Sequence, residues 1–309
     1  FDDGGSWSKF QLNLPPVPIH DLAVKNDNLI AATHGRSFWM IDDLTPLHQI
    51  SNDMTGKDFH LFKPMPGYRM AGGSGFGEVN RKLEGENHPG GVMVHFYVKN
   101  VDDKSEGKLD FLQMDGQLIK SYSNKAKEKT DQLTIKKGGN RFVWNMRYPG
   151  YKTFPGMVYY GSPNLGPKAV PGKYKVRFTI NGQSSEQEFE ILKDPRVTIT
   201  QEDFQAQFDF LVKVRDKVSE ANQGVMDIRK IKEDLGYLKN KVGTDVQYKD
   251  LNEAVKKFEE QLTIIENNIH QTKNRSVQDA LNYGIKLNNR LAHLVVEQGQ
   301  GDYRPTQQG

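Results

Sequence analysis

The hydrophobic pattern of the sequence changes its period near residue 195, and this change limits the possible folds more than any other feature. Before it, apolar residues form short alternating runs separated by Gly, Asn, Asp and Pro, as in β-strands and turns. After it, apolar residues recur every three or four positions, which predicts amphipathic helices. A chain of 309 residues can hold two or three domains, each with its own core. We therefore expect a multidomain protein, mainly β at first and α afterwards.

The first 44 residues are predicted to form part of a β-propeller. Short strands are expected over residues 19–24, 29–33 and 37–41, because each run is apolar and a turn signal follows each of the first two. A further outer strand is expected over residues 8–14, where polar and apolar residues alternate. Short strands at this spacing are typical of one propeller blade. Residues 1–44 are therefore predicted to be a terminal blade, present here as a fragment.

A resemblance to a known family supports this blade. The first seven residues follow the spacing Asp-x-Gly-x-Ser-Trp, and residues 32–39 read Ala-Thr-His-Gly-Arg-Ser-Phe-Trp. Together they resemble the closing blade of bacterial proteins with BNR (Asp-box) repeats, which are similar to Vps10/sortilin-like and sialidase-like propellers and are often labelled glycosyl hydrolases. The resemblance covers residues 1–43 well. Residues 45–309 look like the C-terminal region of the same secreted proteins.

The resemblance implies a structural role for the residues of the Asp-box. In this motif the aspartate caps backbone N–H groups of a tight hairpin, the glycine supplies a positive φ, and the aromatic ring anchors the turn in its sheet. The residue that the motif has two positions before the aspartate is not in this sequence, so we expect the chain to begin inside a turn of a larger protein. The residues of this structural motif are Asp2, Gly4, Ser6 and Trp7.

Blade connectivity in this family also implies a ligand-binding face. The turn 34–36 and the segment 15–18 are expected to lie on the face opposite the Asp-box, where sialidase-type enzymes bind ligand. Arg36 is the first candidate, because a guanidinium can bind a carboxylate through two hydrogen bonds. The alternative is that Arg36 pairs with a neighbouring blade. His34 is the second candidate, and its alternative is an ordinary turn residue.

Residues 45–194 are predicted to contain a connector followed by a second β domain. Residues 45–90 are rich in Gly and Pro without clear periodicity, so we expect an extended connector. Its glycine cluster at 72–77 lacks the lysine of a P-loop, and a flexible turn is the expectation there. About seven strands are expected over residues 91–194, with hairpin turns at 115–116 and 181–182. This pattern favours an immunoglobulin- or fibronectin-like β-sandwich.

One strand of this region carries two aromatic residues on the same face. Phe142 and Trp144 are separated by one residue, so both side chains point to the same side of a strand. We expect them to lie in the core of the sandwich. The alternative is an exposed platform on which a sugar stacks.

Residues 195–309 are predicted to form an antiparallel α-helical bundle, truncated at its C-terminus. A helix start is expected at Thr200, where the pattern Thr-x-x-Asp resembles a capping box. Apolar stripes then predict three helices with a common core. The alternative is that the stripe over residues 251–269 faces outward and binds another protein. The side chains expected to share the core are Phe204, Leu211, Phe258, Leu262, Leu281 and Leu291.

Composition excludes several classes of function. The 42 basic and 39 acidic residues nearly balance, which argues against a dedicated nucleic-acid binder. The absence of cysteine excludes disulfides and a cysteine nucleophile. No apolar stretch is long enough to span a bilayer. The carboxylate pairs 2–3 and 42–43 are expected to cap turns, with a calcium site as the alternative. We identify no catalytic residues, no metal site and no cofactor.

Two functions follow from the sequence. The preferred one is a non-catalytic C-terminal region of a secreted, surface-attached or periplasmic bacterial propeller protein, which braces the propeller and binds protein. The alternative is part of a sialidase-like glycoside hydrolase or glycan-binding protein whose active-site residues lie in upstream blades. The expected partners are the remaining propeller blades, on the same polypeptide or on a separate chain, and a protein or glycan ligand.

Overall fold

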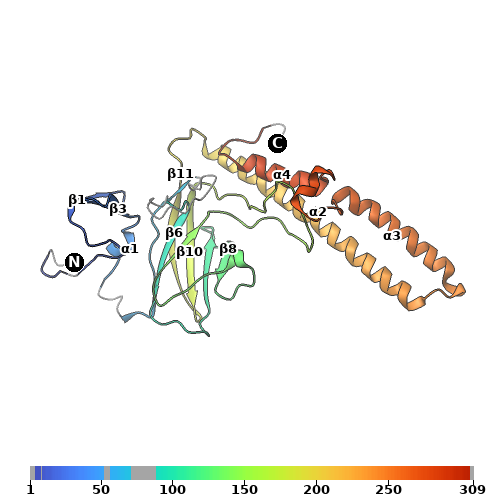
Figure 1. Ribbon diagram of the computed structural model, residues 1–309, viewed down its shortest axis with the longest axis horizontal. Helices are drawn as coiled ribbons and strands as arrows, with labels where there is room; N and C mark the ends of the chain where they lie inside the picture. The colour runs from blue at the N-terminus through green and yellow to red at the C-terminus, as the bar shows by residue number, and fades with distance from the viewer. Residues whose placement is uncertain (1–3, 8, 52–55, 71–87, 307–309) are drawn as a thin grey trace. The chain divides into compact units, whose positions relative to one another are not determined.

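The computed structural model describes residues 4–7, 9–51, 56–70 and 88–306 (Figure 1). Over these residues the fold is mixed, with three β-sheets followed by a C-terminal region of three α-helices. The chain divides into two compact units. The β-rich unit comprises residues 1–144 and 173–190, and the helical unit comprises residues 145–172 and 191–309. The four segments expected from the sequence, with boundaries at 44, 90 and 194, stay a prediction.

The first sheet contains β1 (Ile19–Lys25), β2 (Asn28–Thr33) and β3 (Phe38–Ile41). The strands are antiparallel and lie in chain order. The prediction of these three strands is confirmed. The expected outer strand at 8–14 is wrong for the described residues 9–14, because Leu14 N donates to Gln11 O at 2.9 Å and closes a turn. Leu12 in this turn has a φ of 47°, which no β-strand allows.

The described part of the segment expected to be an extended connector contains three short elements. They are α1 (Thr45–His48), β4 (Phe59–Leu61) and β5 (Gly67–Arg69). β4 and β5 each join a different one of the two larger sheets. In its described residues the segment is therefore not purely extended, since it supplies an edge strand to each of the two larger sheets.

The two larger sheets have the strand orders β5-β11-β10-β7-β8 and β4-β6-β9. Most of the predicted strand runs are confirmed, but residues 132–135 form only an isolated bridge between Gln132 and Ser123. The remaining strands are β6 (Val92–Val98), β7 (Gly107–Leu112), β8 (Leu118–Ser123), β9 (Gly138–Trp144), β10 (Gly172–Ile180) and β11 (Gln183–Lys193).

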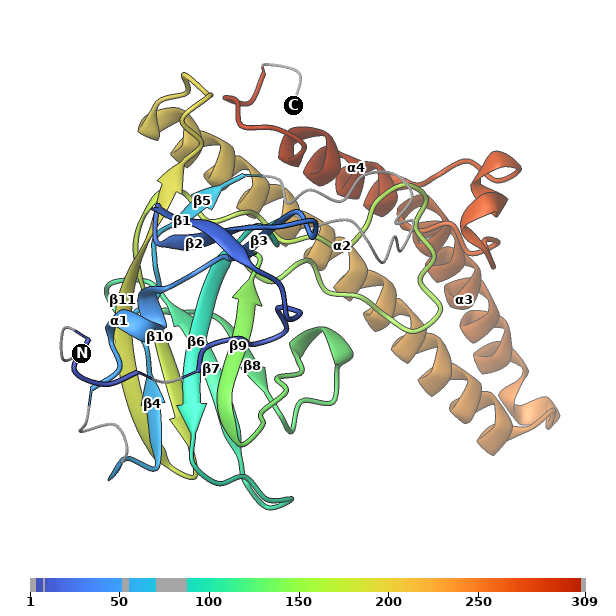
Figure 2. The same ribbon diagram turned by 60° about the vertical axis from the view of Figure 1, so that its left-hand side comes forward.

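An aromatic core joins these two sheets face to face, and Figure 2 shows β6 and β9 in front of β7, β8 and β10. Trp144 on β9 stacks on Phe111 of β7 with a centroid distance of 4.4 Å. Phe96 on β6 packs on Phe178 of β10 at the same distance. Trp144 is fully buried and Phe142 is half-buried on the same side. The prediction that this pair faces the core is confirmed.

The helical unit contains α2 (Gln201–Val242), α3 (Lys249–Ile269) and α4 (Leu287–Gly299). Short 3-10 turns lie at Val246–Tyr248 and Val277–Leu281. The predicted helix start is confirmed, because the Thr200 hydroxyl accepts a hydrogen bond from Asp203 N at 3.2 Å. α2 and α3 run side by side in opposite directions (Figures 1 and 2).

The apolar core of the helical unit includes residues that the sequence assigned to the β domain. Tyr151 and Tyr159, from the segment between β9 and β10, are buried beside Leu211 of α2 and Ala292 of α4. Leu291 packs against this cluster. The segment 145–172 thus supplies aromatic side chains to the helices.

The prediction of one core shared by six helical side chains is wrong. Leu281 is 74% exposed, because the segment expected to start the third helix forms a 3-10 turn. Phe258 is 44% exposed, whereas Leu262, four residues later on α3, is buried. α3 therefore buries only one side of the stripe that the sequence predicted.

Candidate functional site

The predicted ligand-face residues His34 and Arg36 lie in the exposed turn between β2 and β3. Gly35 has a φ of 79°, which favours glycine, and the Trp39 indole donates to Arg36 O at 3.0 Å. The Arg36 guanidinium makes no ion pair with any residue in the described ranges. Its role as a ligand contact stays a prediction.

The same turn adjoins the segment that precedes β1. His34 N donates to Pro18 O at 3.0 Å, and the His34 ring stacks on His20 with a centroid distance of 5.1 Å. Segments 15–18 and 34–36 therefore lie together, and their place on the face opposite the Asp-box stays a prediction. Two histidines and one arginine are thus available at this end of the sheet.

The Asp-box is described in part. Asp2 lies outside the described residues, while Gly4, Ser6 and Trp7 lie within them. Gly4 has a φ of 90°, and the Trp7 indole donates to Gly4 O at 3.0 Å. The Trp7 side chain is 89% exposed, so it does not enter a core formed by the described residues. The structural role of the motif stays a prediction.

The sheet β1-β2-β3 exposes apolar side chains on both of its faces. Leu22 and Val24 are 59% and 65% exposed. They lie on one face, because they are two positions apart on β1 and their partners on β2 are also two positions apart. Phe38 and Met40 are 75% and 54% exposed and lie on the other face, since they pair with the alternate β2 positions. Neither face is covered by another part of the described chain.

A buried carboxylate lies where this sheet ends. Asp43 accepts hydrogen bonds from Thr45 N at 2.8 Å and from the Thr45 hydroxyl at 2.6 Å, so its predicted capping role is confirmed. Its Oδ2 lies 3.2 Å from His95 Nε2. Burial alone would raise the pKa of Asp43, but the adjacent His95 ring and the hydrogen bonds from Thr45 together lower it below 3.8. Asp43 is therefore charged at neutral pH and lies against the His95 ring.

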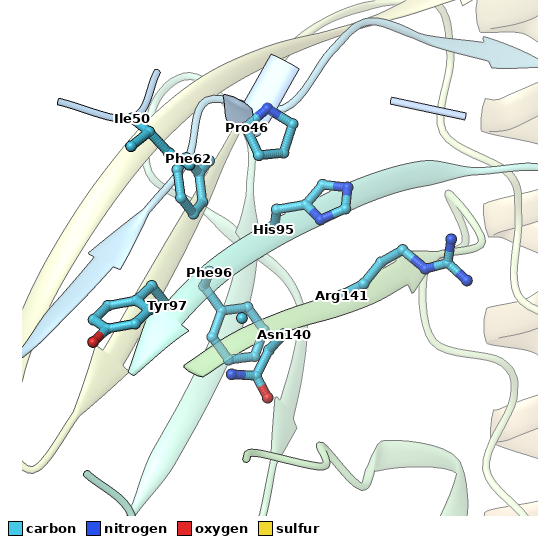
Figure 3. Close-up of a pocket in the computed structure, with 9 residues that line it drawn as sticks. Pro46, Ile50, Phe62, His95, Phe96, Tyr97, Asn140 and Arg141 are labelled. Carbon is cyan, nitrogen blue, oxygen red and sulfur yellow. The ribbon is translucent and has the colours of Figure 1, made fainter. Parts of the chain in front are cut away.

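His95 forms part of the wall of a cavity of about 550 Å³ on the outer face of the sheet β4-β6-β9 (Figure 3). β6 supplies His95 and Tyr97, and β9 supplies Gly139 and Arg141. The cavity is lined mostly by apolar and aromatic groups, and the other lining residues are Pro46, Ile50, Phe62, Phe96 and Asn140. Its chemistry suits an apolar ligand with one polar group.

Sequence reasoning missed this cavity. His95 and Arg141 are cross-strand partners, and so are Tyr97 and Gly139. These pairs depend on the pairing of β6 with β9, which are separated by two other strands in the sequence. The available signal was a glycine at an outward-facing position of a predicted strand, which leaves a gap beside its neighbours.

The described residues contain no group of three or more His, Asp or Glu side chains arranged to hold a metal ion. None of their helices combines the length and hydropathy needed to cross a bilayer.

Comparisons with known proteins assign no family. No protein-family model matches the chain. A search of the curated proteins likewise finds no match. Among solved structures, the chain is distantly similar to CopC from Methylosinus trichosporium OB3b, with a TM-score of 0.19 and 12% identity over 34% of this chain and 79% of that chain. A likeness at this level assigns neither a fold nor a function.

Proposed function

We propose that this chain is a non-catalytic region of a secreted, surface-attached or periplasmic bacterial propeller protein, in which the sheet β1-β2-β3 is a propeller blade. The chain would brace the propeller and bind protein. The observation that carries this proposal is the presence of exposed apolar side chains on both faces of this sheet.

Two apolar faces require two neighbours. An antiparallel sheet at a protein surface has one apolar face toward a core and one polar face toward water. A propeller blade differs, because it lies between two other blades in a radial array. Leu22 on one face and Phe38 on the other are the residues that such neighbours would cover. The outer edges of β1 and β3 are also unpaired within the described residues, and exposed edges favour pairing with further strands.

The remaining parts of the chain fit the bracing role. We propose that the two larger sheets are an immunoglobulin- or fibronectin-like β-sandwich, which their antiparallel pairs and shared aromatic core support. We propose that α2, α3 and α4 are an antiparallel bundle. Both parts would act as rigid supports for the blade.

A surface on α3 supports protein binding. Leu251, Phe258 and Ile265 are spaced by seven residues and are 39%, 44% and 48% exposed. Val255 and Leu262 are buried. A seven-residue apolar repeat is typical of a helix that packs along another helix. The exposed repeat is thus suited to a helical partner.

Binding to the remaining propeller blades tests the proposed function. The assay is a pull-down and calorimetric titration of the purified chain with the polypeptide that carries those blades. The double variant Leu22→Ser/Phe38→Ser should abolish association, because it makes both faces more polar. Leu118→Ser is the matched control, since Leu118 is 54% exposed on β8, outside the blade. Equal binding by the double variant and the control contradicts the proposal.

A further inference from the structure

The cavity beside β6 and β9 is a built feature of the sheet. The side chains of His95 and Tyr97 point to the outer face, because Phe96 between them is fully buried in the core. Phe62 follows β4 and lines the cavity, and its N–H donates to His95 O at 3.1 Å. Residues around α1 cover the upper part of the cavity in Figure 3. A volume of about 550 Å³ lies within the range of small-molecule sites, roughly 300–1,000 Å³.

A glycine keeps this cavity open. Gly139 is paired with Tyr97 in the sheet, so a side chain at position 139 would point to the same face as Tyr97. The backbone of Gly139 does not require glycine, because its φ is not in the left-handed region, whereas the neighbouring Gly138 has a φ of 90°. A Cβ added at Gly139 would meet no atom of the described chain within 4 Å. Glycine in a strand interior lowers stability. Because the backbone does not need glycine here, we attribute its presence to the open space that it leaves above the sheet.

One cation lies at the edge of the cavity. Arg141 is exposed two residues after Gly139 on the same face of β9, and it makes no ion pair within the described residues. Figure 3 shows its guanidinium on one side of His95, with Pro46 and Phe62 on the other. A charged carboxylate, Asp43, also lies beside His95, but it is buried and accepts a hydrogen bond from Thr45 N. The guanidinium is therefore free to bind one anionic group.

We propose that this cavity binds a small carboxylate with an aromatic body. The ring would lie over Gly139 between Tyr97 and Phe62, and the carboxylate would pair with the Arg141 guanidinium. Positions 139 and 141 are about 7 Å apart along the strand, so a ring over Gly139 with a two-carbon spacer directs its carboxylate toward the Arg141 side chain. One guanidinium neutralises one negative charge, which fits a carboxylate better than a doubly charged phosphate. This site is independent of the proposed blade.

The test uses 3-phenylpropionate as the probe and the full chain as the protein. Binding is measured by calorimetry and by NMR shifts of the backbone amides of Gly139, Asn140 and Tyr97. The wild-type protein should bind saturably and shift these amides. Arg141→Gln should weaken binding at least about tenfold, because it removes a charge-assisted hydrogen bond. The neutral analogue 3-phenylpropionamide should lose affinity by a similar factor.

Two variants keep this test specific. Gly139→Val should fold as the wild type does, since a β-branched residue suits a strand and its side chain enters open space, and it should abolish binding. Arg290→Gln, at an exposed arginine on α4, should leave affinity unchanged. The proposal is overturned if the probe does not bind, if Gly139→Val binds with wild-type affinity while its circular dichroism is native, or if Arg141→Gln and Arg290→Gln behave alike.

Discussion

Replacing Trp144 by Ala should destabilise the β-rich unit by about 3–5 kcal/mol, the usual cost of truncating a large core aromatic side chain. The value should lie toward the upper end of this range. Trp144 is fully buried, stacks on Phe111 at 4.4 Å, and meets Phe189 and Tyr174 at 6.0 and 6.3 Å. Each aromatic pair adds about 0.5–1.5 kcal/mol beyond its buried area.

The variant Trp144→Phe separates packing from the loss of the indole N–H. The Trp144 Nε1 is buried without a hydrogen-bond partner among the described residues. Removing a buried N–H of this kind relieves a cost of about 1–3 kcal/mol, which offsets part of the lost contact area. A phenyl ring also keeps the stack on Phe111. We therefore expect Trp144→Phe to cost less than about 1.5 kcal/mol, as conservative core substitutions do.

Urea denaturation followed by circular dichroism and tryptophan fluorescence measures these changes. Trp7 is exposed and Trp39 is half-buried, so the loss of a blue-shifted emission component should report the removal of Trp144. A cost below about 1 kcal/mol for Trp144→Ala would refute the core assignment. A fully folded Trp144→Ala protein that loses glycan or partner affinity would favour a ligand platform.

Three further predictions concern the helices and the end of the blade. The pKa of His270 is lowered from 6.5 by burial and by a nearby arginine, so its folded state stays neutral while the unfolded chain takes up a proton. The contribution of His270 to the stability of the helical unit should be fully present above about pH 6.5 and be lost as the pH decreases. His270→Gln should flatten this pH dependence in urea titrations between about pH 7 and pH 5. Leu262→Asp should cost at least about 3 kcal/mol in thermal unfolding because it buries a charge, whereas Phe258→Asp, at a 44% exposed position, should cost less than about 1 kcal/mol. Similar costs for the two would contradict the observed orientation of α3. Asp43→Asn should cost about 1–2 kcal/mol at neutral pH, as the loss of a charged cap does, and should reduce acid destabilisation below about pH 4, because the folded pKa of Asp43 lies below 3.8 and its contribution is lost as the pH falls. Denaturation midpoints measured at several pH values check this, and an unchanged acid limb would contradict it.

Local signals were sufficient to predict most strands and the start of the long helix. The hairpin turns follow from residues that accept a positive φ, and the structure places Gly116, Asn181 and Gly182 at 90°, 48° and 82°. The helix start at Thr200 follows from a side chain that caps the N–H three residues later. Each of these features depends on residues close together in the sequence.

Long-range features were not predictable in the same way. β4 and β5 are three residues long, and their stability depends on pairing with strands far along the chain. The segment 145–172 joins the helical unit through contacts such as the Tyr159 hydroxyl, which donates to Asn222 Oδ1 at 2.7 Å. A buried asparagine in a helix gives no sequence signal of its distant partner.

The two candidate sites differ in the same way, because one depends on local signals and the other on long-range strand pairing. The turn with His34 and Arg36 was visible because glycine and flanking strands mark it locally. The cavity was not visible in the sequence. It requires Arg141 on β9 to lie beside His95 on the neighbouring strand β6, and it requires open space at Gly139. Periodicity shows which face a side chain takes, and it does not show which strand lies next to it.

Hydroxyl-radical footprinting of the blade in the assembled parent protein tests the central claim most directly. The method reports the solvent exposure of individual side chains, and Leu22 and Phe38 are 59% and 75% exposed on opposite faces of the sheet. If β1-β2-β3 is a blade, both side chains should become protected when the remaining blades are present, relative to the chain alone. Protection of neither residue, or of one face only, would contradict the account.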